Sequence, residues 1–491
     1  MSNYPDYLTA SDFYQFVNCP HWPYYERFAT DEEKTLRRQV TDSEKHRQEN
    51  GLAHELDVVK ELMKDQQIDE VPVTRNAEAD WEATRALMAQ GVPLIYQGTL
   101  TSGDWTGRPD LLERHDGASV FGDWHYVPVD VKSTHFLEKY QKLQLSFYAA
   151  LLEKLQGRFP AEPAIINRDG ERIPFAAGDF VADFELFVVE LERIRAGEKP
   201  DPVLRKSCFD TGVWGTVCER FAKSTNDIAL LYNVNVEKLK TLRALGVRSV
   251  EDAAEMDPMA LDGVAKGLRL HGLEVMKRQA QALKDCSVLV REPVVLPNPP
   301  LEIHFDIESD PPFDRDYLYG FLVRRPEGDE YISFVAETHD GEKQMWESFL
   351  AWIKELPSDY VVYHFSSYEL TRLGTLAKRY GTEDDQWLAA FQSHMVDLKE
   401  ITTHAITFPL YFYGLKYIAK FLGFSWRSDV KGGSQSIDVF EKFLATHDRA
   451  LLDSIILYNE DDVRATAHLK DWLVKYAKNV SSYGKPYPWT I

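Results

Sequence analysis

A proline-rich segment at residues 291–300, REPVVLPNPP, is the feature that most limits how this chain can fold. Its four prolines lack backbone N–H groups and have a fixed φ, so neither a helix nor a central strand can pass through it. We therefore expect an extended linker here, with separately folded parts on both sides. A chain of 491 residues is also too long for one core, and its length favours about three domains.

The segment before the linker, residues 223–290, is predicted to be entirely helical. Apolar residues recur at helical spacing in VEKLKTLRAL and LEVMKRQAQAL, and glycines separate such stretches. The two outer segments, residues 1–222 and 301–491, contain both kinds of element. Strand patterns such as HYVPVDVK and LEIHFDIES are followed by longer helical patterns, so we expect a multi-domain α/β chain.

The composition excludes several classes of protein. Hydrophobic residues make up 44% of the chain, enough for several packed cores. No stretch approaches the ~18 consecutive apolar residues of a membrane span, and the first residues lack the pattern of a secretory signal. Four cysteines are too few for the disulfide framework of a secreted protein. We expect a cytoplasmic protein with no membrane contact.

The net charge of −22 argues against a protein that holds nucleic acid mainly through its phosphates, because such proteins usually carry a basic face. Two considerations weaken this objection. The charge of clustered carboxylates is offset where they bind divalent cations. Residues 225–285 are also neutral, with nine Lys and Arg against nine Asp and Glu. We therefore expect weak, salt-sensitive binding of nucleic acid unless a partner adds positive surface.

Carboxylates gather in two elements of the C-terminal segment. In the strand LEIHFDIES, the period of two places Asp306 and Glu308 on one face. Two adjacent carboxylates repel one another unless a cation lies between them. On the last predicted helix, Tyr458 and Asp462 are four residues apart and share a face. Taken alone, the strand could equally be an acidic edge strand and the helix could present a solvated acidic face.

In this order and spacing, most of the C-terminal segment resembles a DnaQ-like exonuclease of the RNase H fold, in the DEDDy subclass. The first motif, D-x-E, matches Asp306 and Glu308, and the third, Y-x-x-x-D, matches Tyr458 and Asp462. HFSSYE stands where the family usually has H-N-x-x-F-D, and it puts Glu369 at the acidic position. The helix GLKYIAKFLGF also matches the family's pattern before the third motif.

This resemblance implies a 3′–5′ exonuclease that uses two Mg²⁺ or Mn²⁺ ions, hard cations that prefer carboxylate ligands. Asp306 would lie between the two ions, and Tyr458 would orient the attacking water. Asp397, in HMVDLKE, would be a supporting acid outside the metal ligands. The implied metal ligands are Asp306, Glu308, Glu369 and Asp462.

Four short polar patterns mark the N-terminal segment. GLAHE places a histidine early on a predicted helix, and GRPD places an aspartate after a proline. In the strand VPVDVK, Asp130 and Lys132 share a face, and in the helix QLSFY, Gln144 and Tyr148 lie one turn apart. Taken one at a time, these patterns have simple explanations: a D-x-K pair is usually a surface ion pair, and a lone histidine is usually structural.

Together the four patterns resemble the RecB-like branch of the PD-(D/E)xK nucleases, with a restriction-endonuclease-like α/β fold over roughly residues 8–222. In that family Lys132 would help to position or activate water and offset charge that builds on the phosphate. Gln144 and Tyr148 would lie against the nucleic acid or the wall of the site. The implied ligands of one or two divalent cations are His54, Asp110 and Asp130.

Some RecB-like nucleases carry an iron–sulfur cluster on one upstream and three downstream cysteines. Cys19, in NCPHWPYYER, has the upstream context, and CFDTGVWGTVC supplies Cys208 and Cys218. Thr211 stands where the fourth cysteine would be, and three thiolates are one fewer than such a cluster usually has. Either another ligand such as Asp210 completes a labile cluster, or the cluster has been lost and packing replaces it. We favour its loss.

The helical segment resembles a helix-hairpin-helix pair of the kind that grips nucleic-acid backbones. YNVNVEKLKTLRALGVRSVEDAA follows that layout, with Gly246 at the end of a helix. The usual G-x-G of the hairpin is replaced by Asn233-Val234-Asn235, and asparagine adopts left-handed geometry less readily than glycine. The segment could equally be a spacer that sets the positions of its neighbours.

The whole layout resembles a bacterial family of RecB-like nucleases. It implies a RecB-like domain at 1–222, a helix-hairpin-helix module at 223–290, the linker at 291–300 and an RNase H-like exonuclease at 301–491. We expect a metal-dependent nuclease that hydrolyses DNA, trims 3′ ends with its C-terminal site and acts in DNA repair or phage defence. Two alternatives are an RNA-processing exoribonuclease and a catalytically degenerate binding scaffold for a helicase. The chain has no G-x-x-x-x-G-K-[ST] motif, so ATP-driven unwinding would require that partner.

Overall fold

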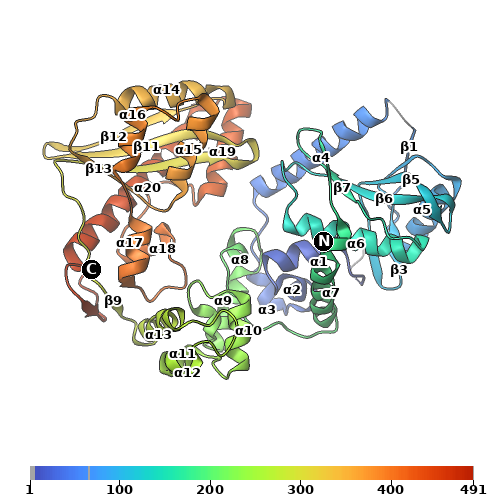
Figure 1. The fold of residues 1–491 in the computed structure, drawn as a ribbon, viewed down its shortest axis with the longest axis horizontal. Helices are drawn as coiled ribbons and strands as arrows, with labels where there is room; N and C mark the ends of the chain where they lie inside the picture. The colour runs from blue at the N-terminus through green and yellow to red at the C-terminus, as the bar shows by residue number, and fades with distance from the viewer. Residues whose placement is uncertain (1–5, 65–66, 490–491) are drawn as a thin grey trace. The chain divides into compact units, whose positions relative to one another are not determined.

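The computed structural model describes residues 6–64 and 67–489, and it divides into two compact units, Met1–Ser224 and Thr225–Ile491 (Figure 1). Both units combine helices with a mixed β-sheet, which confirms the prediction of a multi-domain α/β chain. The outermost residues of the predicted first and last domains, 1–5 and 490–491, lie outside the described part. Among the described helices, none has both the length and the apolar character needed to cross a bilayer.

The first unit is built around a six-stranded sheet in the order β1-β2-β5-β6-β7-β8. At its centre β5 (Leu111–Ser119) and β6 (Gly122–Val131) form an antiparallel pair. Helix α6 (Lys139–Gln156) then connects β6 to its parallel neighbour β7 (Ala164–Ile166), close to the helix that the sequence predicts. The other strands are β1 (Ile68–Glu70), β2 (Leu94–Tyr96) and β8 (Arg172–Pro174).

The alternation of side chains along β5 gives this sheet two apolar faces. Leu112 belongs to a buried cluster that includes Phe147 of α6, whereas Leu111 packs with Val59 of helix α4 (Asp42–Leu62). Complete burial of one such side chain stabilises the fold by about 1.5–3 kcal/mol. Side chains also alternate along β6, so only every second residue of this strand can face a site on a given side of the sheet.

Helices from the two ends of the first unit pack against one another. Tyr25, from the start of the chain, lies with its ring centroid 5.4 Å from that of Trp214, and both belong to one buried cluster. The helices of this unit besides α4 and α6 are α1 (Ala10–Asn18), α2 (Trp22–Phe28), α3 (Asp31–Thr35), α5 (Ala77–Gln90), α7 (Val181–Arg195), α8 (Ser207–Asp210) and α9 (Gly215–Ser224). A separate hairpin joins β3 (Leu100–Ser102) to β4 (Trp105–Gly107).

The second unit contains a five-stranded sheet in the order β12-β11-β10-β13-β14. Strand β10 (Leu301–Asp310) pairs antiparallel with β11 (Arg315–Arg325) and parallel with β13 (Tyr360–His364). The strand LEIHFDIES is therefore central, and the alternative of an acidic edge strand is wrong. The edges are β12 (Gly328–Val335) and β14 (Met395–Asp397).

The two faces of β10 have different roles. On one face Phe305 stacks on Phe321 with ring centroids 4.5 Å apart, in a core that also includes Phe349. That core is covered by α14 (Glu342–Ile353), α15 (Tyr368–Tyr380) and α16 (Gln386–Ser393). The opposite face carries the acidic residues and packs against the long helix α20 (Arg449–Tyr476) and against α19 (Gly433–Thr446).

Residues 225–290 fold as part of the second unit. Tyr232 stacks on Tyr413 with ring centroids 4.4 Å apart, and Gln279 Nε2 donates a hydrogen bond to the carbonyl oxygen of Leu410 at 3.3 Å. The segment is helical up to Asp285, as predicted, but Val288–Val290 form strand β9, so the prediction that residues 223–290 are entirely helical is wrong at this end. Its helices are α10 (Val236–Ala244), α11 (Val250–Glu255), α12 (Pro258–Leu261) and α13 (Leu270–Asp285).

The proline-rich segment has neither helix nor strand, as predicted, but it is not free of the second unit. Val294 is buried, and its N–H donates to the carbonyl oxygen of Ala477 at 2.8 Å. Just before it, β9 (Val288–Val290) joins a three-stranded sheet with β15 (Ile406–Thr407) and β16 (Ser481–Tyr483). Helices α17 (Leu398–Ala405) and α18 (Leu415–Phe421) complete the unit.

Candidate active site

Strand β10 and helix α20 bring three carboxylates together in the second unit. Oxygens of Asp306, Glu308 and Asp462 all lie within 4.8 Å of one another. The first two share a face of β10 because side chains alternate along a strand, and α20 packs on that face. Glu308 and Asp462 are buried, and Asp306 is half-buried. The D-x-E and Y-x-x-x-D patterns therefore meet in space.

Helix α20 approaches β11 closely because the strand carries a glycine opposite Asp306. Gly320 is the register partner of Asp306, and a Cβ there would overlap the side-chain oxygen of Asn459. In this space Asn459 Nδ2 donates to Asp306 Oδ2 at 2.9 Å. Tyr331 OH donates to the side-chain oxygen of Asn459 at 2.9 Å and so fixes the direction of the amide. Asn459 thus holds Asp306 in one orientation, although no sequence motif singled it out.

The other two carboxylates of the cluster are also oriented by neighbouring donors. Trp426 Nε1 donates to Asp462 Oδ1 at 2.6 Å. The hydroxyl of Tyr317 lies 3.5 Å from Glu308 Oε2 and 2.8 Å from Ser436 Oγ. Because an ionised carboxylate has about four lone-pair positions, these contacts leave acceptor capacity for a further ligand.

Glu369 approaches the cluster from the first turn of α15, although it lies outside the group of three within 4.8 Å. Its Oε2 lies 3.4 Å from His364 Nδ1. Between them Ser366 has a φ of 109°, a value that L residues other than glycine rarely adopt. Asp397 accepts a hydrogen bond from the Ser366 N–H at 3.0 Å and caps α17. Asp397 therefore supports the turn before Glu369 and does not belong to the cluster itself.

Burial raises the pKa of all four carboxyl groups and is the largest cause for each. The charges of Asp462, Glu308 and Glu369 raise the pKa of Asp306 further, and the pKa of Glu308 rises to about 8. Acids in such an arrangement cannot all ionise unless positive charge lies among them. The cluster thus has the ligand type and the unbalanced charge of a divalent-cation site.

Tyr458 and Lys416 border the cluster. Lys416 Nζ lies 4.2 Å from the centroid of the Tyr458 ring and donates to the carbonyl oxygen of Lys431 at 2.7 Å. Burial lowers the pKa of Lys416, and the charges of Asp462 and Glu308 oppose that change. Burial and the nearby carboxylates raise the pKa of Tyr458 far above its usual range. Its hydroxyl therefore keeps its proton and can act as a neutral hydrogen-bond donor.

A second cluster, in the first unit, joins Asp110, Asp130 and Lys132. Lys132 Nζ lies 3.1 Å from Asp130 Oδ2 and 3.6 Å from Asp110 Oδ2. The backbone N–H of Asp110 donates to Asp130 Oδ1 at 3.2 Å, and the N–H of Val131 donates to Asp110 Oδ2 at 2.8 Å. Burial raises the pKa of Asp110 to about 7, against the charge of Lys132. Asp130 is 1% exposed, so this D-x-K pair is not an ordinary surface ion pair.

Glu55, which the motifs did not select, is linked to this second cluster. Its Oε1 accepts a hydrogen bond from Gln97 Nε2 at 2.7 Å, and the same nitrogen lies 3.4 Å from Asp110 Oδ1. The neighbouring His54 is placed differently. Within the described ranges, the ligand atoms of His54, Asp110 and Asp130 do not all lie within 4.8 Å of one another. The sequence signal that could have identified Glu55 is its position directly after the histidine of the GLAHE pattern.

The Gln and Tyr of QLSFY are held by one another on α6. Gln144 Nε2 donates to the Tyr148 hydroxyl at 3.0 Å, and that hydroxyl donates to the carbonyl oxygen of Arg108 at 3.2 Å. Burial raises the pKa of Tyr148 well above its usual value, and the charge of Asp130 adds to this. Tyr148 therefore lies close enough to the second cluster for the charge of that cluster to change its pKa.

The three cysteines of the upstream and downstream motifs also converge, as free thiols. Cys19 Sγ and Cys218 Sγ are 3.5 Å apart, and hydrogen bonds from these two thiols lower the pKa of Cys208 to about 3. Asp210 is exposed and pairs with Lys206 at 3.5 Å. It therefore does not provide the missing fourth ligand.

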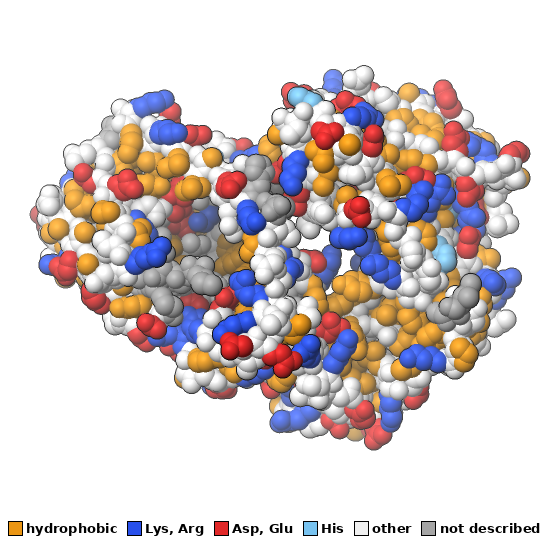
Figure 2. Space-filling model, turned by 180° about the vertical axis from the view of Figure 1, so that it is seen from behind, with side chains coloured by type: hydrophobic (Ala, Val, Ile, Leu, Met, Phe, Trp, Pro, Cys, Tyr) orange, Lys and Arg blue, Asp and Glu red, His pale blue; other side chains and the backbone are white. Residues whose placement is uncertain are grey.

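The next question is whether basic side chains gather on one face in spite of the net charge of −22. On the face shown in Figure 2, Lys and Arg side chains are interspersed with Asp and Glu over most of the surface. Phosphate-binding proteins usually concentrate their positive charge on one face. The expectation of weak, salt-sensitive binding therefore stays a prediction.

Comparison with known families agrees with the geometry of the second unit. Residues 303–474 match the family model described as RNase_H superfamily, which confirms the prediction of an RNase H-like domain at the C-terminal end. That superfamily consists of nucleases and phosphoryl-transfer enzymes, so the match supports a nuclease-type function and nucleic-acid binding. A search among curated proteins found no match to the chain. The matched segment begins in β10 and ends in α20, and it therefore includes the whole carboxylate cluster.

Proposed function

We propose that this chain is a metal-dependent nuclease whose C-terminal site removes nucleotides from the 3′ ends of DNA. The observation that carries the proposal is the convergence of Asp306, Glu308 and Asp462 inside the segment that matches the RNase H superfamily. Three acids this close, with raised pKa values, are unfavourable without a cation and are what a cation-dependent phosphodiesterase requires.

The ligand set fits Mg²⁺ or Mn²⁺ because hard cations prefer carboxylate oxygens. When bound, two such ions activate a water molecule and stabilise the departing 3′ oxygen. Asp306 would hold an ion together with its neighbours, since the charges of the other three carboxylates all act on it. The residues that would hold the ions are Asp306, Glu308, Glu369 and Asp462.

The chain's own side chains provide orientation and charge control. Asn459 and Trp426 hold Asp306 and Asp462 through hydrogen bonds of 2.9 and 2.6 Å. Tyr458, which keeps its proton, can donate a hydrogen bond to an attacking water and direct it toward phosphorus. Lys416, beside the ring of Tyr458, adds positive charge that offsets charge developing on the phosphate.

We further propose a second nuclease site, of the PD-(D/E)xK type, in residues 1–222. It is supported by the group of Asp110, Asp130 and Lys132, in which Asp130 is buried, the other two are half-buried, and the lysine lies within 3.6 Å of both carboxylates. The two aspartates would hold one or two divalent cations, and Lys132 would position water and offset charge on the phosphate. Additional candidate ligands are Glu55, through its link to Asp110, and His54, from the sequence pattern.

The helical module, residues 223–290, is proposed to contact the nucleic-acid backbone. Asn233 has a φ of 60°, the left-handed geometry that a glycine of the hairpin would provide. The side chain of Asn235 caps α10 by accepting from the Lys238 N–H at 2.9 Å. In the cell we propose a cytoplasmic role in DNA repair or phage defence, with a helicase as partner.

The test compares the degradation of 3′- and 5′-labelled single-stranded DNA and RNA in Mg²⁺ and in Mn²⁺. Asp306→Ala should abolish stepwise shortening from 3′ ends, Asp130→Ala should remove the second activity, and the double variant should be inactive. Asp453→Ala, which changes an exposed aspartate on α20, is the matched control. A preference for RNA would support the exoribonuclease alternative. Binding without turnover in either ion would contradict the proposal and favour the scaffold.

A further inference from the structure

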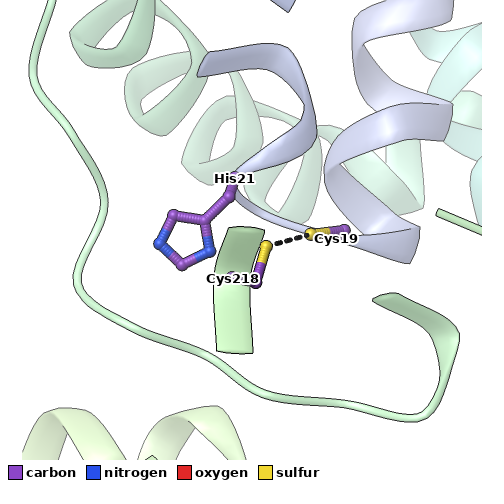
Figure 3. Close-up of side chains that lie close together, drawn as sticks. All are labelled: Cys19, His21 and Cys218. Atoms are coloured by element: carbon purple, nitrogen blue, oxygen red, sulfur yellow. Dashed lines mark hydrogen bonds between the residues drawn. The ribbon is translucent and has the colours of Figure 1, made fainter. Parts of the chain in front are cut away.

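A buried group in the first unit contains the atoms of a metal site that neither nuclease cluster uses. The ligand atoms of Cys19, His21 and Cys218 all lie within 4.8 Å of one another, and none of the three residues is more than 1% exposed. Figure 3 shows the two sulfurs side by side and a ring nitrogen of His21 directed toward the sulfur of Cys218. Cys208 is also buried and belongs to the same packed cluster, and its thiol lies 3.7 Å from the carbonyl oxygen of Val203.

The hydrogen bond of His21 determines which ring nitrogen is available to a metal ion. Its Nε2 lies 3.1 Å from the carbonyl oxygen of Pro200. A carbonyl can only accept, so Nε2 carries the proton and Nδ1 is the atom that faces the thiols. Histidines that bind metals usually donate their second ring N–H to a carbonyl or carboxylate in this way, which fixes the ring and its tautomer.

We propose that Cys19, His21, Cys208 and Cys218 bind one Zn²⁺ as a closed tetrahedral structural site. Three thiolates and one imidazole are a common ligand set for structural zinc. The imidazole of His21 takes the place that the sequence pattern leaves empty at Thr211.

Distances favour a single ion over an iron–sulfur cluster. Tetrahedral zinc with Zn–S bonds of about 2.3 Å holds two thiolate sulfurs about 3.8 Å apart. Cys19 Sγ and Cys218 Sγ are 3.5 Å apart, within reach of that value after a small adjustment. In a four-iron cluster each cysteine binds a different iron, so the sulfurs stand much farther apart. The ligand atoms of Cys19, His21 and Cys218 lie within 4.8 Å of one another, which suits one small ion, and the proposed fourth ligand, Cys208, is buried in the same packed cluster.

The position of the site gives it a structural role. Cys19 and His21 lie at the junction of α1 and α2, whereas Cys208 and Cys218 lie on α8 and α9, nearly 200 residues later. An ion here would tie the two ends of the first unit together beneath Tyr25 and Trp214. Closing so long a loop reduces the entropy of the unfolded chain, and metal binding adds directly to the stability of the fold.

The first experiment measures zinc, iron and acid-labile sulfide in the full chain, purified without chelator and under nitrogen. We expect about one zinc per chain and no stoichiometric iron. About four irons with sulfide would overturn the proposal in favour of a cluster. A metal-free protein whose three buried thiols stay unligated after incubation with Zn²⁺ would overturn it as well.

Variants identify the ligands. Cys218→Ser and His21→Ala should each lower zinc affinity at least tenfold, as measured by competition with a chromogenic chelator. Cys286→Ser is the matched control, because Cys286 is only half-buried and its thiol faces the carbonyl oxygen of Leu283 at 3.8 Å. Zinc affinity equal to wild type in His21→Ala would remove His21 from the site and overturn the four-ligand assignment.

Substitutions of buried ligands can prevent folding, so a measurement on the unaltered protein is also needed. X-ray absorption at the zinc edge should give about three sulfur neighbours and one nitrogen neighbour. A shell of nitrogen and oxygen alone would place the ion elsewhere and contradict the proposal. Because neither this spectrum nor the metal content depends on nuclease activity, failure of the zinc site leaves both proposed nuclease sites standing.

Discussion

Asn459 Nδ2 donates a hydrogen bond of 2.9 Å to Asp306 Oδ2, so the residue that follows Tyr458 on α20 orients the first carboxylate of β10. Loss of an outer hydrogen bond to a metal ligand typically lowers metal affinity or activity about 10–100-fold. We expect Asn459→Ala to raise the Mn²⁺ concentration needed for half-maximal exonuclease activity by that factor. Asn479→Ala, at an exposed position, is the control. An unchanged Mn²⁺ requirement would mean that Asp306 is held without Asn459.

Gly320→Ala tests the close approach of α20 to β11. The new Cβ would overlap the side chain of Asn459, and overpacking of a core typically costs about 1–3 kcal/mol. We expect a loss of unfolding free energy of this size in urea titrations, together with weaker Mn²⁺ binding. Gly374→Ala, on α15 with open space around it, should instead gain about 0.5–1 kcal/mol because alanine favours the helix. Equal stability of Gly320→Ala and wild type would show that α20 can move away without cost.

The metal-free protein should lose stability as the pH rises. The folded pKa of Glu308 is about 8, above its ordinary value of 4.5, so the folded chain binds more protons than the unfolded chain between these values. Unfolding free energy therefore falls as pH rises through this interval, by up to about 1.4 kcal/mol per pH unit for each group that titrates. Melting temperatures with a chelator should be lower at about pH 9 than at about pH 6.

Two comparisons identify the carboxyl groups that cause this pH dependence. Excess Mg²⁺ should remove much of the loss because it replaces the protons among the carboxylates. Glu308→Gln should flatten the dependence in the chelated protein, whereas Asp110, whose folded pKa is about 7, still contributes from the first unit. A chelated wild type that is more stable at the higher pH would contradict the charge crowding described for the site.

The sequence was sufficient to predict the secondary structure around the proposed sites, because simple periods govern it. A period of two places Asp306 and Glu308 together, and a spacing of four does the same for Tyr458 and Asp462. Such periods describe one element at a time. They could not reveal Asn459, whose role depends on a glycine on a different strand that leaves room for its amide.

The roles of His21 and of the helical module also depend on contacts between distant parts of the chain, which sequence periods do not describe. His21 lies two residues after Cys19, and its use depends on Pro200, which is adjacent only in the folded chain. The proline-rich segment correctly predicts an interruption of regular structure. It does not predict that the helical module packs with the second unit, because that depends on the stacking of Tyr232 on Tyr413 across a long separation in sequence.

Lys132→Ala should inactivate the N-terminal site. The ammonium group lies 3.1 Å from Asp130, and removal of one preorganised charge or donor commonly costs about 10²–10³ in rate. The substitution is best made in an Asp306→Ala background, where any remaining cleavage of DNA is attributed to the first unit. Lys64→Ala, at an exposed lysine of the same unit, should leave that activity unchanged. Wild-type cleavage by Lys132→Ala would exclude a role for this lysine in the second site.

Tyr458→Phe separates positioning of water from binding of metal. The hydroxyl keeps its proton because burial and nearby carboxylates raise its pKa, so its loss removes a hydrogen-bond donor and no charge. An interaction made only in the transition state lowers kcat and leaves KM unchanged, and here the fall should be about 10²-fold. The Mn²⁺ concentration for half-maximal activity should also stay unchanged, in contrast to Asn459→Ala. Tyr476→Phe, on the same helix, controls for loss of a hydroxyl elsewhere on α20. If Tyr458→Phe instead raised the Mn²⁺ requirement at constant kcat, the tyrosine would support the carboxylates and not the attacking water.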